Sequence, residues 1–366
     1  DRSSAASDVY KRQAQHRAAP GQLTNAEGHE LIDQLTSYER PYPMLVLTGG
    51  DCFERPDLVD LIEYAVGKGL HVSISPSVTP LFTRERVKAV QDAGVSVMSM
   101  SLDGGSAETH DAFRGFPGTF DRTIEACHML NELGMRFQLN TVFTAKNIHE
   151  APQMLKNAID LGAFMFYTFM LVPTGRGQHL DMLTPHERED VLHWLHDNST
   201  RIAIKTTEAP QYRRIAFQRE AVRQGKAAPA KHGELYHWLT KETHELLGEN
   251  IEEPRPPRTP LAINSGSGFA FIDHTGDVYP SGFLPIHCGS IKDTPFPQIY
   301  RESEVFRALR NPSGFEGKCG ACEFNHFCGG SRSTAYAMTG NYLASDPSCA
   351  HIPAGYTGEL PEGIER

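Results

Sequence analysis

The stretch "PMLVLTGGD" at residues 43–51 joins a short apolar run to two glycines and an aspartate. An apolar run of this length that ends at a glycine turn is typical of a strand buried on both faces. The segment before it, "LTNAEGHELIDQL" at 23–35, carries Thr24 three residues ahead of Glu27, which is the pattern of a helix capping box. A helix followed by a buried strand is therefore predicted at the start of the ordered chain.

The same couplet of amphipathic helix and apolar strand recurs along the first half of the chain. Helices are predicted at 57–68, 83–93, 119–133 and 148–161, and the strands that follow them at 71–75, 95–101, 135–143 and 164–172. One further strand is possible at 201–206, "RIAIKT", inside a stretch from 178 to 258 whose pattern is otherwise helical. Such alternation is typical of βα units on a parallel sheet, so the predicted fold class is α/β, with a complete or partial barrel.

Polar, glycine-rich segments stand at the ends of the predicted strands. They are "TGGD" (48–51), "SPSVT" (75–79), "SLDGG" (101–105), "LNT" inside the fourth strand (139–141) and "PTGRG" (173–177). Because parallel strands end at one rim, and barrel active sites lie on that rim, these segments are expected to converge. Short turns need the same residue types for structural reasons, so each segment taken alone favours a purely structural role. Five on one rim favour a ligand site.

Composition limits the possible partners. The chain has 39% hydrophobic and 22% charged residues and a net charge of −10, and it contains no basic run that could follow a phosphate backbone. This argues against a nucleic acid partner. The longest apolar run, at 163–173, is shorter than the roughly 20 residues that a membrane-spanning helix needs. No membrane contact and a cytoplasmic location are therefore expected.

The second half of the chain contains a boundary signal and a hairpin signal. "EEPRPPRTP" at 252–260 is too rich in proline to continue a helix, and a domain boundary is predicted there. "FAFIDHTGDVYPSG" at 269–282 alternates like a strand, turns at 273–276 and returns, which predicts a β-hairpin. His186, His193 and His196 alternate with acidic residues, and a solvated helix face is the favoured interpretation of them.

Four of the seven cysteines crowd the last 50 residues. They are Cys319, Cys322, Cys328 and Cys349, in the pattern CxxCx5C followed by twenty intervening residues. An odd cysteine count fits a disulfide framework poorly, whereas a CxxC pair on a glycine-containing turn can bring two thiolates to one metal centre. Four thiolates suit one zinc ion or one [4Fe–4S] cluster, and their spacing does not separate the two. Unliganded oxidisable thiols are the less favoured alternative.

Two runs carry a family resemblance. "SLDGGSAETHDAFRG" followed by "TFDRTIEAC" in the barrel, and "CGACEFNHFCGGSR" with "DPSC" near the end, are similar to the radical S-adenosylmethionine (SAM) enzymes that carry a C-terminal SPASM-type domain. The resemblance runs from about residue 14 to the end of the chain and is strongest to haem-modifying and peptide-modifying members. It implies a partial (β/α)6 TIM-like barrel without its first strand, followed by a small SPASM or twitch-like iron–sulfur domain.

The resemblance also implies the cofactors and their ligands. Gly49, Gly50 and Asp51 stand where the family holds the amino group of SAM, through backbone carbonyls and a carboxylate. An ammonium group has only donors, so acceptors at a strand end suit it. The remaining implied cofactor contacts are Ser75, Ser77 and Ser101 near the ribose or carboxylate, Asn140 near the ribose, and Arg176 near the adenine or carboxylate end. The four clustered cysteines are implied to hold an auxiliary [4Fe–4S] cluster.

One departure from the family concerns its defining CxxxCxxC loop, whose three thiolates bind the cluster that cleaves SAM. No cysteine precedes Cys52, so the printed chain is expected to be inactive. Residues 1–13 show no regular periodicity and are expected to be an unstructured tail or a foreign junction. The parent gene is expected to encode the loop directly before Ala14, and a second [4Fe–4S] cluster is expected only in that full-length parent.

The domain division implied by these observations is a barrel at 14–200, a helical extension or linker at 201–258 and an auxiliary cluster domain at 259–366. A full-length parent is expected to abstract a hydrogen atom from a peptide or tetrapyrrole side chain, with a flavodoxin or ferredoxin as reductant. The alternative is a non-catalytic protein that is stabilised by zinc or a cluster and binds its ligand with the barrel. Asp103 and Arg114 are plausible ligand contacts, although helix-cap and surface ion-pair roles are favoured. Cys127 is predicted to be a buried structural thiol, and Cys288 is left unassigned.

Overall fold

The computed structural model describes residues 20–251, 254–255 and 262–365. The expected tail at 1–13 lies outside the described residues. So does most of the proline-rich stretch at 252–260, where the domain boundary is predicted.

A six-stranded parallel sheet forms the centre of the described chain. Its strands are β1 (Leu45–Leu47), β2 (Val72–Ile74), β3 (Val97–Ser101), β4 (Phe137–Phe143), β5 (Met165–Met170) and β6 (Ala203–Thr207), in the order β1-β2-β3-β4-β5-β6. The five strands predicted from the repeated helix–strand couplet are present, and so is the possible sixth. The α/β prediction is confirmed. Because β6 pairs with β5 along the register Tyr167↔Lys205, the barrel sheet extends past residue 200.

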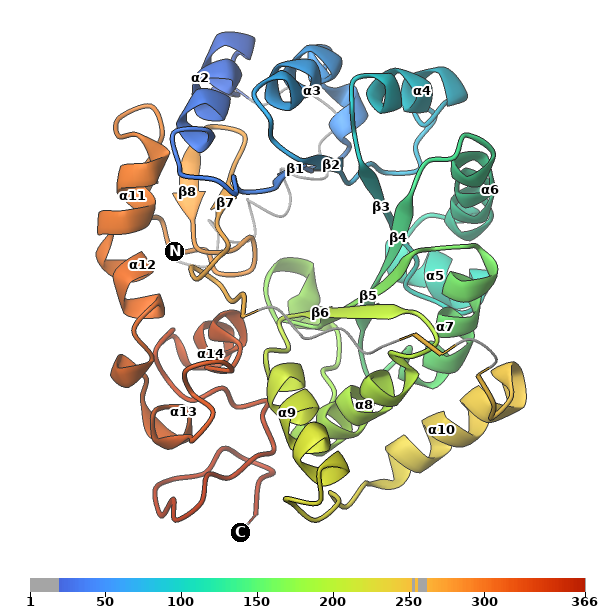
Figure 1. Cartoon of the computed structure of the whole chain (residues 1–366), viewed down its shortest axis with the longest axis vertical. Helices are drawn as coiled ribbons and strands as arrows, with labels where there is room; N and C mark the ends of the chain where they lie inside the picture. Colours follow the sequence, from blue (N-terminus) through green and yellow to red (C-terminus); the bar gives the residue numbers. More distant parts are fainter. Residues whose placement is uncertain (1–19, 252–253, 256–261, 366) are drawn as a thin grey trace.

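The helices of the first 250 residues cover the outer side of this sheet, which curves as an open arc (Figure 1). They are α2 (Asn25–Leu35), α3 (Leu58–Gly67), α4 (Arg84–Asp92), α5 (Ala107–Arg114), α6 (Thr119–Glu132), α7 (Ala151–Asp160), α8 (Pro185–Asn198), α9 (Gln211–Arg223) and α10 (Glu234–Leu247). Short 3-10 turns lie at η1 (Cys52–Glu54), η2 (Ile148–Glu150) and η3 (Gly175–His179). Alternate strand residues pack against this helical layer: Phe137, Leu139 and Phe143 of β4 are at most 1% exposed. The predicted capping box of α2 is present.

The C-terminal region, drawn in orange to red, lies on the open side of the arc (Figure 1). It contains β7 (Phe271–Ile272), β8 (Asp277–Tyr279), β9 (Gly289–Ser290), α11 (Phe296–Glu302), α12 (Glu304–Leu309), η4 (Pro312–Gly314), α13 (Gly317–Ala321) and α14 (Arg332–Thr339). The predicted hairpin is confirmed, since β7 and β8 pair antiparallel. Its turn is closed by Asp273, whose carboxylate accepts hydrogen bonds from the backbone N–H groups of Thr275 and Asp277.

The prediction that the three histidines of α8 lie on a solvated face is wrong for His193. His186 is exposed, but His193 is only 3% exposed and its ring lies 4.6 Å from that of His232. The physical reason is that α8 packs against both α9 and α10, so residues on several sides of it are buried. None of the helices in the described ranges is both long and apolar enough to cross a membrane.

Candidate functional site

The ends of β1 and β2 are tied together by Asp51. This carboxylate is 7% exposed; it accepts hydrogen bonds from the backbone N–H of Phe53 (3.1 Å) and from the hydroxyl of Thr79 (2.6 Å). The hydroxyl of Ser77 donates to the carbonyl of Gly50 at 2.6 Å. Gly49 has φ +149°, a conformation that side-chain-bearing residues rarely adopt. The first two rim segments therefore form one hydrogen-bonded unit, with carboxylate and carbonyl oxygens concentrated at the strand ends.

The next two strands bring further predicted residues to the same sheet. Ser101 ends β3 and lies in register with Asn140 of β4, whose side-chain oxygen accepts a hydrogen bond from Gln138 at 2.9 Å. Ser75 follows β2, and its N–H donates to the carbonyl of Leu47 on β1. Asn140 and Gln138 alternate with the buried residues of β4, so they lie on the face away from the helices.

Arg176 lies in η3, directly after the fifth strand. Only its place in the chain is described. Apart from Asn140, which lies in the middle of β4, the predicted rim residues lie at strand ends or in the segments that follow the strands of one parallel sheet.

The four clustered cysteines line one cavity in the C-terminal region. Its other walls are formed by Arg214 of α9 and by residues of the last hundred: Lys318, Asn325, Gly329, Gly330, His351 and Pro353. Cys319, Cys322 and Cys328 come from α13 and the loop after it, and Cys349 from the segment after α14. Four cysteines that line one small cavity can contribute to a shared metal centre.

The loop backbone around the thiols can follow this path only with glycine at two positions. A Cβ atom on Gly320 would lie 2.0 Å from the carbonyl oxygen of Phe315. Gly330 has φ +67°, and a Cβ atom there would lie 3.0 Å from the Cys319 sulfur. A side chain at Gly320 would collide with the backbone of Phe315, and one at Gly330 would press against Cys319, which lines the cavity.

Hydrogen-bond donors point at two of the sulfur atoms. The backbone N–H of Asp346 donates to Cys319 Sγ at 3.3 Å, and the guanidinium of Arg332 lies 3.5 Å from the same atom. The backbone N–H of Phe324 donates to Cys322 Sγ at 3.4 Å. Donors to sulfur stabilise thiolates and the negative charge of an iron–sulfur cluster.

Two buried cations add to this electrostatic environment. Lys318 is 2% exposed and donates to the carbonyl of Cys349. Arg214 is 2% exposed and forms a bidentate pair with Glu189, at 2.8 and 2.6 Å. Positive groups held beside four sulfurs favour an anionic occupant.

Burial dominates the acid–base behaviour of the cysteine thiols around the cavity. It raises the pKa of Cys328 to about 12 and that of Cys349 and Cys322 to about 11, although Arg214 acts in the opposite direction on each. These thiols are therefore protonated at neutral pH without a metal, and metal binding must release their protons.

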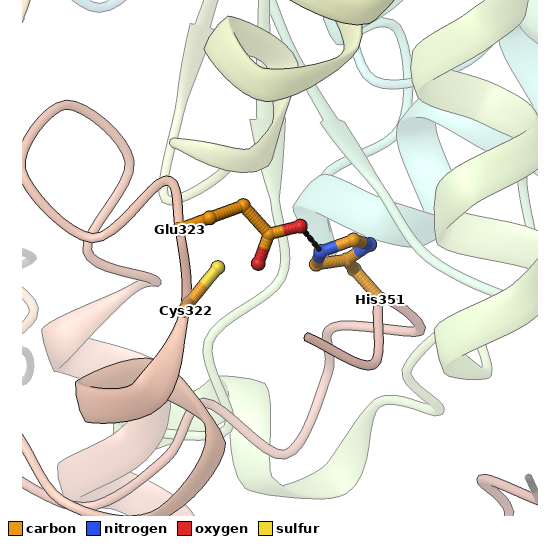
Figure 2. Close-up of side chains that lie close together, drawn as sticks. All are labelled: Cys322, Glu323 and His351. Carbon is orange, nitrogen blue, oxygen red and sulfur yellow. Dashed lines mark hydrogen bonds and ion pairs between the residues drawn. The ribbon is translucent and has the colours of Figure 1, made fainter. Parts of the chain in front are cut away.

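A second possible ligand group overlaps the cavity. The sulfur of Cys322, a carboxylate oxygen of Glu323 and a ring nitrogen of His351 lie within 4.8 Å of one another. Figure 2 shows Cys322 and Glu323 projecting from one loop toward His351. The Nε2 atom of His351 and the Oε1 atom of Glu323 lie 3.1 Å apart and share a hydrogen bond. Sulfur, oxygen and nitrogen ligands at this separation suit zinc better than an iron–sulfur cluster.

Comparison with known proteins decides the family. The profile described as the radical SAM superfamily matches residues 12–158. The chain is 39% identical, over 91% of its length and 81% of the relative's, to an AdoMet-dependent heme synthase of Oleidesulfovibrio alaskensis. It is 38% identical to an AdoMet-dependent heme synthase of Methanosarcina barkeri, over 94% of this chain and 93% of that protein. The chain belongs to the radical SAM enzyme family.

Solved structures with the same fold agree with this radical SAM assignment. The chain superposes on native anSMEcpe with bound AdoMet with a TM-score of 0.60 at 16% identity, over 90% of this chain and 85% of the other. For Streptococcus suis SuiB bound to S-adenosylmethionine the TM-score is 0.54 at 13% identity, over 92% and 71%. The predicted resemblance and the partial barrel are confirmed.

A buried polar network in the radical SAM chain joins the cysteine region to the barrel, and the sequence analysis misses it. Asp346 accepts hydrogen bonds from Gln211 of α9 (2.6 Å) and from the backbone N–H of Ser331 (2.7 Å). Glu208, directly after β6, accepts from the hydroxyls of Ser331 (2.6 Å) and Ser333 (3.0 Å). Burial raises the pKa of Glu208. Its only local signal in the sequence is the group of hydroxyl residues Ser331, Ser333 and Thr334.

The structure also places the four other residues that the sequence analysis singles out. Asp103 is 1% exposed and pairs with Arg114 at 2.5 Å, so the ion pair is present but its carboxylate is buried rather than at the surface. Asp103 also accepts from the backbone N–H of Val142, which fixes it to β4. Cys127 is fully buried, as predicted. Cys288 is half-buried, outside the residues that line the four-cysteine cavity.

Proposed function

We propose that this radical SAM chain acts on a tetrapyrrole of the haem-precursor type rather than on a peptide. The observation that carries this is the ranking of relatives. Three AdoMet-dependent heme synthases are 37–39% identical over 91–94% of the chain. Two relatives that are not named as haem synthases, the mycofactocin maturase MftC and the PqqA peptide cyclase, are 27% and 26% identical.

The rim of the sheet is the proposed SAM site. Gly49, Gly50 and Asp51 would hold its amino group, and the neighbouring serines, Asn140 and Arg176 the rest of the cofactor. The hydrogen bonds that join Asp51 to Thr79 and Gly50 to Ser77 support this role, because they hold acceptor oxygens in place before the ligand arrives. When bound to a reduced cluster, SAM supplies hydrogen-atom abstraction.

The four-cysteine cavity is the proposed site of an auxiliary [4Fe–4S] cluster. The donors to Cys319 and Cys322 and the buried cations Arg214 and Lys318 support an anionic occupant. The second candidate, a zinc-stabilised binding protein, is favoured by one observation, the overlapping group of Cys322, Glu323 and His351. Iron and zinc content after anaerobic reconstitution separates the two: about four irons per chain and a brown colour for the cluster, one zinc and no colour for the alternative.

The printed residues contain no CxxxCxxC motif, so we propose that SAM cleavage depends on a segment that supplies it. An electron donor of the flavodoxin or ferredoxin class would then serve as reductant. The test compares the printed chain with a version in which residues 1–13 are replaced by a designed segment that carries a CxxxCxxC motif.

Both proteins are given SAM, a reductant and an iron tetrapyrrole, and 5′-deoxyadenosine and the tetrapyrrole mass are measured. The printed chain should form no 5′-deoxyadenosine, and the replaced version should form it and change the mass of the tetrapyrrole. A version with the three new cysteines changed to alanine is the matched control. Turnover of a peptide with an unchanged tetrapyrrole would refute the proposed substrate class.

A further inference from the structure

One cross-strand row on the face of the sheet away from the helices ends in a lysine. The register pairs Ser101 with Asn140, Asn140 with Tyr167, and Tyr167 with Lys205, across β3 to β6. The residues beside them in β5, Phe166 and Thr168, are fully buried. Since side chains alternate along a strand, the row faces the open side of the arc, where the C-terminal region lies.

Lys205 holds a free positive charge on this face. Its ammonium nitrogen lies 4.6 Å from the centre of the Tyr167 ring, which shows that the two side chains share the face. Lys205 is exposed, and within the described residues no carboxylate forms an ion pair with it. By contrast, the buried Arg214 pairs with the carboxylate of Glu189, and the buried Arg188 donates to the backbone carbonyl of Glu208.

Aromatic rings continue the surface beside the lysine. The ring of Tyr167 lies 4.7 Å from that of Phe169, which in turn lies 6.4 Å from that of Phe283 in the C-terminal region. The Tyr167 hydroxyl is hydrogen-bonded to Thr207, so the ring is held in place. A cation at the edge of an aromatic wall suits a flat apolar molecule that carries a carboxylate.

We propose that Lys205 binds a carboxylate side chain of the substrate, with Tyr167 and Phe169 contacting its apolar ring. This inference rests on the proposed function, because a tetrapyrrole is the flat carboxylate-bearing molecule in question. The carboxylate of SAM is the competing ligand. It is attached to the same carbon as the amino group that Gly49, Gly50 and Asp51 are proposed to hold at β1, and β1 and β6 are the opposite edges of the sheet.

The experiment titrates iron coproporphyrin III into the printed chain and follows its visible absorption, with SAM binding measured separately by calorimetry. Iron coproporphyrin III tetramethyl ester, in the same detergent-containing buffer, is the probe without carboxylates. The variants are Lys205→Met and Lys205→Arg, with the exposed Lys88→Met of α4 as the matched control. Circular dichroism melting confirms that each variant is folded.

Lys205→Met should weaken binding of the acid about tenfold or more, leave binding of the ester and of SAM unchanged, and be rescued by Lys205→Arg. Equal affinity of the parent and Lys205→Met for the acid, or equal weakening for acid and ester, overturns this inference alone. Weakened binding of SAM reassigns Lys205 to the cofactor and also overturns it. Absence of tetrapyrrole binding by the unchanged chain overturns both this inference and the proposed function.

Discussion

The barrel and the C-terminal region differ in the side chains that fill their interiors, which are mainly apolar in the barrel and include fully buried charged groups in the C-terminal region. The barrel buries apolar side chains such as Phe137, Phe166 and Met98, each at most 1% exposed. The C-terminal region buries Arg332 and Asp346 without any exposure. The guanidinium of Arg332 donates to the carbonyls of Tyr342 (3.1 Å) and Ala344 (2.7 Å), so it acts as an internal brace for a loop-rich segment.

The difference shows where each region obtains its stability. Apolar burial stabilises the barrel whether or not a ligand is present. A small segment built from short helices and hydrogen bonds has little apolar area, and a metal centre is the usual way to stabilise such a segment. The C-terminal region should therefore respond to metal, whereas the centre of the sheet should not.

The largest expected effect is loss of the metal. Cys328→Ser should reduce bound iron from about four per chain to below one, because it replaces one of the four thiolates that are proposed to hold the cluster. Hydrogen exchange should then accelerate in residues 317–350, while amides of β3 to β5 keep their protection. Cys127→Ser, a buried thiol of the barrel, is the matched control and should leave the iron content unchanged. Equal acceleration in both regions would contradict the contrast.

Asp346→Ala should destabilise the protein by about 3–5 kcal/mol. The carboxylate accepts four hydrogen bonds, from Gln211, the N–H of Ser331, and the N–H and hydroxyl of Ser348, and its removal leaves these buried donors unpaired. Urea unfolding at neutral pH measures the loss. Asp121→Ala on the exposed side of α6 should change stability by less than about 0.5 kcal/mol. A similar small change for Asp346→Ala would show that the polar network does not stabilise the fold.

The sequence predicts the secondary structure of the barrel better than that of the C-terminal region. Strand and helix periodicity is local, so β1 to β6 are predicted from apolar spacing alone. Helix α5 is missed, because it has only eight residues, and α9 is covered only by the general prediction of a helical stretch, since it is largely polar with a weak apolar stripe. Clustering of the four cysteines is predicted by their spacing.

The polar network could not be predicted in this way. Glu208 and Asp346 are separated from their partners Ser333 and Gln211 by more than 120 residues, and nothing in the local sequence marks a carboxylate as buried. The burial of His193 is missed on the same grounds, since it depends on how α8 packs between two other helices. The local sequence gives the type of each residue, but tertiary contacts decide whether that residue is buried.

A smaller, pH-dependent effect is expected from the helices next to the barrel. Burial, with a further contribution from Arg219, lowers the pKa of His196 to about 4. The unfolded chain binds this proton near pH 6.5, so lowering the pH through that range favours unfolding. Stability should fall by about 2 kcal/mol between pH 7 and pH 4.5 from this residue. His196→Gln should remove this contribution to the pH dependence of the free energy of unfolding, as measured with urea. His71→Gln, at an exposed position, should leave the pH dependence unchanged.

The smallest effect concerns the rim of the barrel. Asp51→Asn keeps the size of the side chain but replaces one acceptor oxygen by an NH2 donor. That donor would face a group that now donates to the carboxylate, either the hydroxyl of Thr79 or the N–H groups of Phe53 and Ser77. One lost buried hydrogen bond should cost about 1–2 kcal/mol in urea unfolding. Asp57→Asn, a partly buried carboxylate on the same segment, controls for general charge loss. The lost bond joins the turns after β1 and β2, so hydrogen exchange should accelerate at residues 49–53 and 75–79. Exchange around the four cysteines should stay unchanged. A change made in the barrel alone would then show that the two regions are stabilised independently.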